Sequence, residues 1–447
     1  MATGKALDGK PYAGNPHVRF DEGEVASCTA EASLRRVHCR RQPEGRASVC
    51  AATPRRGSLL YNIVTKLCAV FAIACQCCTE NAVACTAIIV GKNASATGHV
   101  LIGHNEDVGG AVMRHAMLPA HDGTAAAFWS EAKNPNGGDK VAGLLYNEHG
   151  VFVVSNNGGV MRNWGGEKYS LPDEGYYSSV TDGGLGYNLR VKMIKRARTA
   201  REGVDIMVAL IEKHGYNQDS RNFLIADADE AWIVEVLYGR RYIARRVPDD
   251  EVVVYPNCLV FNKPRAGDIM SKCFSEKGND FDVIKAYQGP RSWKSVYNCY
   301  RWRELYRLVA GVTEDAKDEY PFSVKVAHKI TVENIKKGLC SHYEGCEYEV
   351  KARHPKKGPG IIAPICRDTT VQSIVCELMP NTSETVMHMT VGRPCEKPYG
   401  VYRPFGGKLP EDTVYGKEAL ERIKHFDAPI AGAIDGIRED GRCDCAS

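Results

Sequence analysis

The chain has 447 residues, of which 44% are hydrophobic and 25% are charged, a composition typical of soluble globular proteins. This composition excludes a disordered chain, a collagen-like fibre and a protein with many membrane spans. The formal net charge of +4 resides in residues 1–57, which hold ten Lys and Arg against six Asp and Glu. Because the remainder is neutral, the charge distribution does not favour a nucleic-acid partner.

The segment 67–78 is apolar, about as long as the hydrophobic region of a signal peptide and too short to cross a bilayer alone. Basic residues precede it, and Ala82 and Ala84 follow it in the small-x-small pattern that signal peptidase prefers. A buried core helix is the alternative, although Lys66 and Gln76 suit an apolar core poorly. We therefore predict a zymogen in three parts: an Arg-rich extension at 1–57 outside the fold, a signal-peptide leader at 58–84, and a mature domain at 85–447 that has no membrane span and is secreted or lumenal.

Cleavage after Ala84 would make Cys85 the N-terminal residue, which would then carry both a thiol and a free α-amine. That amine has an ordinary pKa of about 7.7–8.0, so near neutral pH it can accept the thiol proton as a general base. One residue then supplies both the nucleophile and its base. The alternative is a lipobox-like site in which the Cys85 sulfur carries a lipid and cannot act as a nucleophile.

Strand-like patterns begin at Cys85. Residues 85–91 and 99–103 are apolar runs separated by a turn-like segment, which predicts a hairpin that returns to Asp107. A further strand is predicted at 151–155.

A helical pattern covers 186–213, and we expect it to break near Thr199 because Thr199 and Glu202 form a capping-box pair. Strands on both sides of this helical pair predict an α+β fold in which sheets and helices pack in layers. The predicted strands that follow the helices lie at 222–227, 231–237, 241–247 and 251–255.

The cysteines are concentrated in the C-terminal half, where ten lie from Cys258 to Cys445 and none lies between Cys85 and Cys258. This even number predicts disulfides formed in an oxidising compartment, and the alternative is a set of reduced, mostly buried thiols. No Cys-x-x-Cys pair stands beside another, and the chain has no His-Glu-x-x-His motif. We therefore predict no metal site and no cofactor.

The motif that opens with Cys85-Thr-Ala-Ile-Ile-Val-Gly91 is followed by Gly98-His-Val-Leu-Ile-Gly-His-Asn-Glu-Asp107. Further motifs follow in order: Arg198-Thr-Ala-Arg-Glu202, Phe223-Leu-Ile-Ala-Asp227, Glu230-Ala-Trp-Ile-Val-Glu235, Tyr255-Pro-Asn257, Ser341-His-Tyr-Glu-Gly345 and Cys366-Arg-Asp-Thr-Thr370. This ordered series resembles the dipeptidase A family of N-terminal-nucleophile cysteine peptidases, whose relatives include the secernins. The resemblance implies a four-layered αββα N-terminal-nucleophile hydrolase fold and small peptide substrates.

The resemblance also implies roles for the residues at matching positions. Cys85 would be the nucleophile, and Asp107 would be the acid that holds the α-amine. Related enzymes often carry arginine three residues before that acid, where this chain has His104. An imidazole titrates near about 6.5, so we expect His104 to replace the guanidinium in a pH-dependent way. The alternative for His104 is an ordinary polar residue at a strand end.

Attack on an amide carbonyl requires donors for the developing oxyanion. By spacing after the segment 147–150, Asn157 is the first candidate donor and Asn156 is the second. Asn257 matches another amide position of the family. The alternative for each asparagine is an ordinary turn residue.

A dipeptide carries a free ammonium and a free carboxylate, so its pocket should offer an opposite charge to each end. Glu106 and Glu148 are the candidate ammonium partners. Arg301, Arg303 and Arg367 are the candidate carboxylate partners, because a guanidinium can bind a carboxylate through two hydrogen bonds. Solvated surface charge is the alternative for each of these residues.

Three functions follow from these patterns. The favoured one is a cysteine dipeptidase that hydrolyses dipeptides through an N-terminal Cys85. The second is an amide acylase of the penicillin-acylase or bile-salt-hydrolase type. The third is a non-catalytic lipoprotein or binding module anchored at Cys85. The sequence leaves open whether the protein forms a homo-oligomer.

Overall fold

The structure is a computed structural model. It describes residues 84–121, 123–133, 141–159, 163–164, 167–168, 175–186, 189–287, 296–313, 321–355, 362–411 and 413–414. The predicted extension at 1–57 and the predicted leader, apart from Ala84, lie outside the described residues. The three-part division of the chain therefore stays a prediction. Cys443 and Cys445 also lie outside the described residues.

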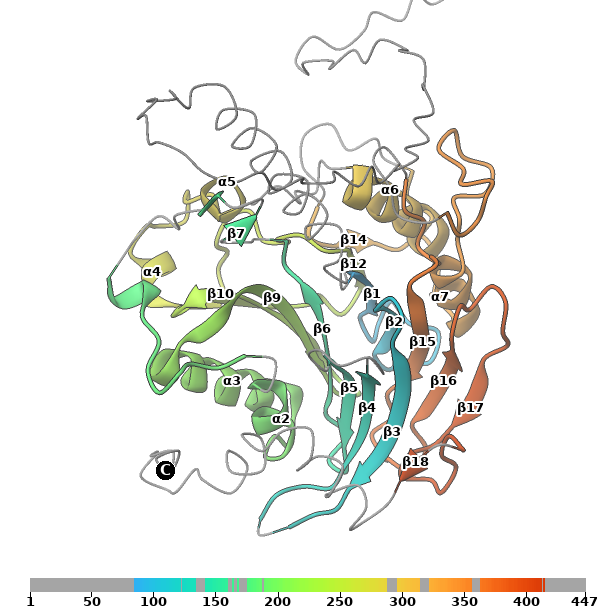
Figure 1. Cartoon of the computed structure of the whole chain (residues 1–447), viewed down its shortest axis with the longest axis horizontal. Coiled ribbons are helices and arrows are strands. Elements are labelled where there is room, and N and C mark those ends of the chain that lie inside the picture. The colour runs from blue at the N-terminus through green and yellow to red at the C-terminus, as the bar shows by residue number, and fades with distance from the viewer. Residues whose placement is uncertain are drawn as a thin grey trace, which may run out of the picture. The chain divides into compact units, whose positions relative to one another are not determined.

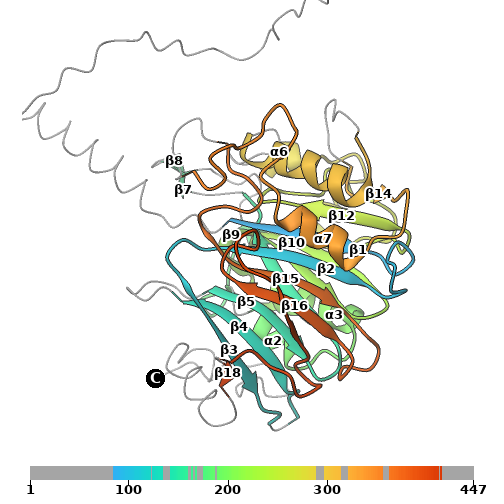
Figure 2. The ribbon, with the colours of Figure 1, turned by 90° about the vertical axis from the view of Figure 1, so that its right-hand side faces the viewer.

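One sheet has seven antiparallel strands, with the predicted hairpin at its centre. Its strands are β1 (Ala84–Val90), β2 (Leu101–Asp107), β12 (Glu251–Tyr255), β14 (Val324–Lys325), β15 (Thr370–Glu377), β16 (Val386–Val391) and β17 (Gly400–Tyr402). They lie in the order β14-β12-β1-β2-β15-β16-β17 (Figure 2). The hairpin is confirmed, because Cys85 on β1 lies directly opposite Glu106 on β2.

A second sheet has nine strands. These are β3 (Val112–Leu118), β4 (Ala127–Lys133), β5 (Val141–Asn147), β6 (Phe152–Asn157), β9 (Tyr216–Ala226), β10 (Ala231–Gly239), β11 (Arg241–Arg246), β13 (Ile269–Met270) and β18 (Thr413–Val414). Their order is β13-β11-β10-β9-β6-β5-β4-β3-β18, and β7 (Asn163–Trp164) pairs separately with β8 (Glu167–Lys168). The five strands predicted between residues 151 and 255 are confirmed as β6, β9, β10, β11 and β12.

The helical pattern of the sequence is confirmed as two helices, α2 (Leu189–Ile194) and α3 (Ala200–His214). The break falls where Thr199 caps α3, because the Thr199 side chain accepts a hydrogen bond from the Glu202 amide at 3.1 Å. The other helical elements are η1 (Tyr176–Ser178), α4 (Lys272–Ser275), α5 (Val283–Tyr287), α6 (Val296–Leu305), η2 (Tyr306–Ala310) and α7 (Val332–Leu339).

The helices cover the outer faces of the two sheets (Figure 1). Alternate residues of β6 and β9 show the division: Val153 and Ile225 pack with α2 and α3, whereas Val154 and Leu224 pack with the core shared with the other sheet. On the seven-stranded sheet, α7 contacts β2 and β15. Gly103 permits this contact, since a Cβ there would collide with Cγ2 of Ile335. The fold is therefore of the α+β class that the sequence predicts.

The described cysteines do not form the disulfides that the sequence predicts. They are all free thiols: Cys85, Cys258, Cys273, Cys299, Cys340, Cys346, Cys366, Cys376 and Cys395. Cys258 and Cys376 are fully buried and pack in the core as small apolar side chains. Cys366 and Cys395 bring their sulfurs to 3.4 Å, which exceeds the roughly 2.0 Å of a disulfide bond.

Within the part of the chain that the structure describes, no helix combines the length and the apolar character needed to cross a bilayer.

Candidate active site

Cys85 is fully buried, and protein groups hold both of its main-chain polar atoms. Its amide nitrogen donates to Oδ1 of Asn257 at 3.1 Å. Arg301, also fully buried, donates from Nη1 to the Cys85 carbonyl oxygen at 2.9 Å and from Nη2 to Asn257 Oδ1 at 3.0 Å. The main chain around the thiol is thus fixed by one amide and one guanidinium.

The thiol of Cys85 faces Glu106 across the hairpin, with Sγ 3.5 Å from Oε1. Burial raises the pKa of the Glu106 carboxyl to about 7. Burial also raises the pKa of the Cys85 thiol, and the charges of Glu106 and Asp107 raise it further. The thiol is therefore protonated in the intact chain and needs a base before it can act as a nucleophile.

Two buried arginines balance the negative charge beside the thiol. The charges of Arg190 and Arg221 lower the pKa of Glu106 against the effect of burial. Both side chains donate to Oγ of Ser155, at 2.9 Å from Arg190 and 3.3 Å from Arg221. The sequence does not indicate these three residues, because no local pattern shows that an arginine on α2 and another on β9 converge on a serine of β6.

Neighbouring side chains of β2 point to opposite faces of the sheet, and this separates Asp107 from Glu106. Asp107 Oδ1 accepts a hydrogen bond from Thr370 Oγ1 at 2.6 Å, and its Oδ2 lies 3.1 Å from Nε of Arg367. Burial raises the pKa of the Asp107 carboxyl to about 6, although the Arg367 charge opposes that rise. Glu106, rather than Asp107, is thus the carboxylate whose side chain contacts the thiol.

The prediction that a cationic His104 assists Asp107 is wrong. His104 Nε2 lies 3.1 Å from Asn156 Oδ1, and burial lowers the pKa of the imidazole to about 4. The ring is therefore neutral near pH 7. The guanidinium expected at this place in the sequence is supplied to Asp107 by Arg367, from a distant segment.

The three candidate asparagines differ in what their amide groups can still bind. Asn156 Nδ2 donates to the carbonyl oxygens of Tyr255 and Pro256 at 3.2 and 3.3 Å, so this amide already has partners. Asn157 is half-buried, and its Oδ1 accepts a hydrogen bond from the Gly159 amide at 2.7 Å. Asn257 Nδ2 is buried with no partner among the described residues, and the contact of Asn157 uses its oxygen alone, so Asn257 and Asn157 both remain candidates to donate to an incoming oxygen.

The remaining candidates lie elsewhere or already have protein partners. Glu148 lies on the exposed turn at the far end of β6, where its Oε1 accepts from the Ala126 amide at 2.9 Å. The Arg303 guanidinium lies 5.5 Å from the centre of the Tyr348 ring. Arg301 and Arg367 hold Cys85 and Asp107 rather than an open carboxylate site.

The sequence model of peptidase family C69 matches residues 175–423, which is more than half of the chain. The chain belongs to peptidase family C69. It is 24% identical over 370 residues to a probable dipeptidase of Latilactobacillus sakei, covering 68% of this chain and 70% of that protein. It is 24% identical over 415 residues to a dipeptidase of Bifidobacterium longum, covering 76% and 74%. The resemblance noted in the sequence is thereby confirmed.

Two solved structures show weaker likenesses. A mutant of the conjugated bile acid hydrolase from Clostridium perfringens has a TM-score of 0.37 and 9% identity, covering 74% of this chain and 99% of that one. Penicillin V acylase from Agrobacterium tumefaciens has a TM-score of 0.36 and 12% identity, covering 71% and 84%.

Proposed function

We propose that this chain is a cysteine dipeptidase whose nucleophile is the thiol of Cys85, released as the N-terminal residue by cleavage after Ala84. The observation that carries the proposal is the buried Cys85 itself, whose sulfur contacts Glu106 and whose nitrogen contacts Asn257. Cleavage converts that amide nitrogen into an amine, which can accept the thiol proton.

The reaction then follows in two halves. The Cys85 amine takes the thiol proton, and the thiolate attacks the carbonyl carbon of the dipeptide. Asn257 Nδ2 donates to the oxyanion of the tetrahedral intermediate. When this intermediate collapses, it expels the C-terminal amino acid, whose nitrogen takes the proton from the Cys85 ammonium. Water attacks the resulting thioester with the amine as base, and this step releases the N-terminal amino acid and restores the thiol.

Glu106 favours a dipeptide over an N-acyl substrate. In a bound dipeptide, the ammonium is attached to the carbon next to the carbonyl under attack. A carboxylate 3.5 Å from the attacking sulfur is therefore within reach of that ammonium. An N-acyl amino acid presents no positive charge there, so this arrangement supports the dipeptidase over the amide acylase.

The two sheets, with α2 and α3 on one outer face and α6 and α7 on the other, support a four-layered αββα N-terminal-nucleophile hydrolase fold. The predicted leader supports a secreted or lumenal zymogen. A lipid on Cys85 would occupy the sulfur that has to attack the substrate, so the lipoprotein and the peptidase exclude each other.

The test is the mass of the mature N-terminus, measured together with activity. Expression of the full chain in a secreting eukaryotic host should yield active protein that begins at Cys85 with an unmodified thiol. Active protein that retains residues before Cys85, or that carries a lipid on it, would refute the proposal.

Substituting the nucleophile separates the chemistry from the folding. Cys85→Ser should remain folded and lose most dipeptide hydrolysis, because a serine hydroxyl is far less acidic than a thiol. Cys346→Ser, at a half-buried cysteine whose sulfur lies 3.4 Å from Glu304 Oε2, is the matched control and should keep full activity. A dipeptide and an N-acyl amino acid assayed side by side distinguish the dipeptidase from the acylase.

A further inference from the structure

Four side chains outside the proposed active site converge on one point, and we call them the Cys/His cluster: His342, His354, Cys366 and Cys395. Their ligand atoms all lie within 4.8 Å of one another. His342 Nε2 is 3.0 Å from His354 Nε2, and Cys395 Sγ is 3.2 Å from the same nitrogen. Cys366 Sγ lies 3.6 Å from His354 Nε2 and 3.4 Å from Cys395 Sγ.

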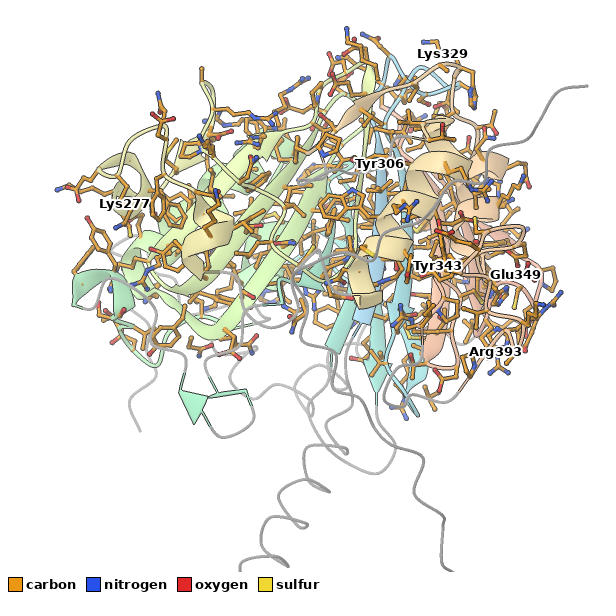
Figure 3. The ribbon with its side chains drawn as sticks, turned by 90° about the horizontal axis from the view of Figure 1, so that it is seen from above. Lys277, Tyr306, Lys329, Tyr343, Glu349 and Arg393 are labelled. Atoms are coloured by element: carbon orange, nitrogen blue, oxygen red, sulfur yellow. The ribbon has the colours of Figure 1, made fainter. Side chains whose placement is uncertain are left out.

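The four residues come from separate parts of the chain. His342 follows α7, His354 lies in the loop beyond it, Cys366 precedes β15 and Cys395 follows β16. In Figure 3, Tyr343 and Arg393, which are near neighbours of His342 and Cys395 along the chain, lie in the same half of the molecule. Only the fold brings these residues together, so no local cysteine or histidine motif in the sequence indicates the cluster.

We propose that the Cys/His cluster binds one Zn²⁺ ion in a tetrahedral Cys₂His₂ site. Zinc binds imidazole nitrogen at about 2.0–2.1 Å and thiolate sulfur at about 2.3 Å, which places tetrahedral ligand atoms roughly 3.3–3.8 Å apart. Four of the six separations between these atoms, from 3.0 to 3.6 Å, lie within a few tenths of an ångström of those values, and all six are within 4.8 Å. The set also uses four protein ligands, as structural zinc sites do.

The second ring nitrogen of each histidine gives an independent reason for a metal. His342 Nδ1 lies 2.9 Å from Glu344 Oε1, and His354 Nδ1 lies 3.3 Å from Glu396 Oε1. Metal-bound histidines commonly donate their other N–H to a carboxylate, which orients the ring and fixes the tautomer. Both histidines here have this arrangement, with Nε2 of His354 beside the two sulfurs and Nε2 of His342 beside that of His354.

Binding releases two protons, because both thiols bind as thiolates while both imidazoles bind in the neutral form. The two negative sulfurs then balance the two positive charges of the ion. No change of oxidation state is involved, so the site requires neither an oxidant nor a reductant.

The site would connect the C-terminal region to the proposed active site. Cys366 is followed directly by Arg367, whose guanidinium pairs with Asp107, and the Cys366 amide donates to the Ser341 carbonyl oxygen at 3.1 Å. A metal at Cys366 would thus fix the segment that leads into β15 and presents Arg367 and Thr370 to Asp107. The ion would have a structural role, at a distance from the thiol chemistry.

The test is the metal content of the purified full-length protein, which does not depend on activity. Protein produced in zinc-supplemented medium, desalted without chelator, should hold about one zinc per chain by elemental mass spectrometry. Cys395→Ser and His354→Asn should each reduce this content at least fivefold. Matched controls are Cys346→Ser and His388→Asn, since His388 also pairs with a carboxylate, Glu377, at 2.7 Å. Both controls should keep the zinc.

Replacement of zinc by Co²⁺ tests the same site without a substitution. The native protein should then show the visible absorption typical of tetrahedral cobalt with thiolate ligands, which decides the question even if the variants fail to fold. Native protein with no stoichiometric zinc and no such cobalt spectrum would overturn the proposal. Peptide mapping under non-reducing conditions that finds a Cys366–Cys395 disulfide would also overturn it.

Discussion

The contact between Glu106 and the Cys85 thiol leads to a prediction about substrate choice. Glu106→Gln keeps the size of the side chain and removes its charge. A hydrogen bond to a charged group contributes about 1.5–3 kcal/mol, which corresponds to roughly 10- to 150-fold in kcat/KM. We expect the substitution to lower kcat/KM for a dipeptide by that factor. It should have little effect on an analogue in which hydrogen replaces the ammonium group.

The pH dependence gives a second measurement of the same effect. Burial raises the pKa of Glu106 to about 7, so in the free enzyme the carboxyl loses its charge as the pH falls below that value. Wild-type kcat/KM for the dipeptide should decrease over this range. The ratio of kcat/KM for the dipeptide to kcat/KM for the analogue without an ammonium cancels the titration of the Cys85 amine, which affects both substrates. This ratio should decrease with falling pH in the wild type and should not do so in Glu106→Gln.

The assay compares both substrates, between pH 5 and 9, in the wild type, Glu106→Gln and the control Glu148→Gln. Glu148 lies on an exposed turn, so its substitution should leave the ratio of the two kcat/KM values unchanged. An equal loss on both substrates in Glu106→Gln would show that Glu106 serves the chemistry or the folding instead of ammonium recognition. No loss on either substrate would refute the reasoning as well.

Two further predictions concern Asn257 and Glu235. Asn257→Ala should lower kcat by about 10²–10³-fold with a smaller change in KM, as measured by steady-state kinetics, because it removes the proposed oxyanion donor. A loss confined to KM would contradict that role. Burial raises the pKa of Glu235 from 4.5 to about 8, so ionisation opposes folding, and stability should fall as the pH rises from about 5 to 8. In denaturant unfolding, the free energy of unfolding of Glu235→Gln should rise relative to that of the wild type over that range. If the two free energies instead changed in parallel with pH, Glu235 would not be the group responsible.

Local sequence patterns predicted the elements whose stability depends on near neighbours. The break at Thr199 was predictable because a capping residue and its partner Glu202 lie three residues apart. The hairpin from Cys85 was predictable because both of its strands are apolar and a turn separates them. In contrast, β3, β4, β5, β15 and β16 were not predicted, because their polar and apolar residues do not alternate clearly enough to identify a strand.

The structure brings together Cys85 and Asn257, which the family motif marks, and Glu106, which the charge of a dipeptide suggests, and their catalytic roles stay predictions. His104 shows the limit of a positional argument. Its place before Asp107 suggested a cationic partner, but residues three apart on a strand face opposite sides of the sheet. The geometry of β2 therefore excludes the contact that the motif suggested. The true partner, Arg367, is 260 positions away from Asp107 along the chain and could be found only from the fold.

The alternation along β2 also explains how one strand serves two purposes. His104 and Glu106 face the space between the sheets, where they meet Asn156 and the Cys85 thiol. Asn105 and Asp107 face the other side, where Asn105 donates to the carbonyl oxygens of Leu339 and Ile365, and Asp107 binds Arg367 and Thr370. The second set connects β2 to the segments that carry His342 and Cys366. A zinc ion at the Cys/His cluster would therefore stabilise the segments that hold β2 from the face opposite to Glu106 and the thiol.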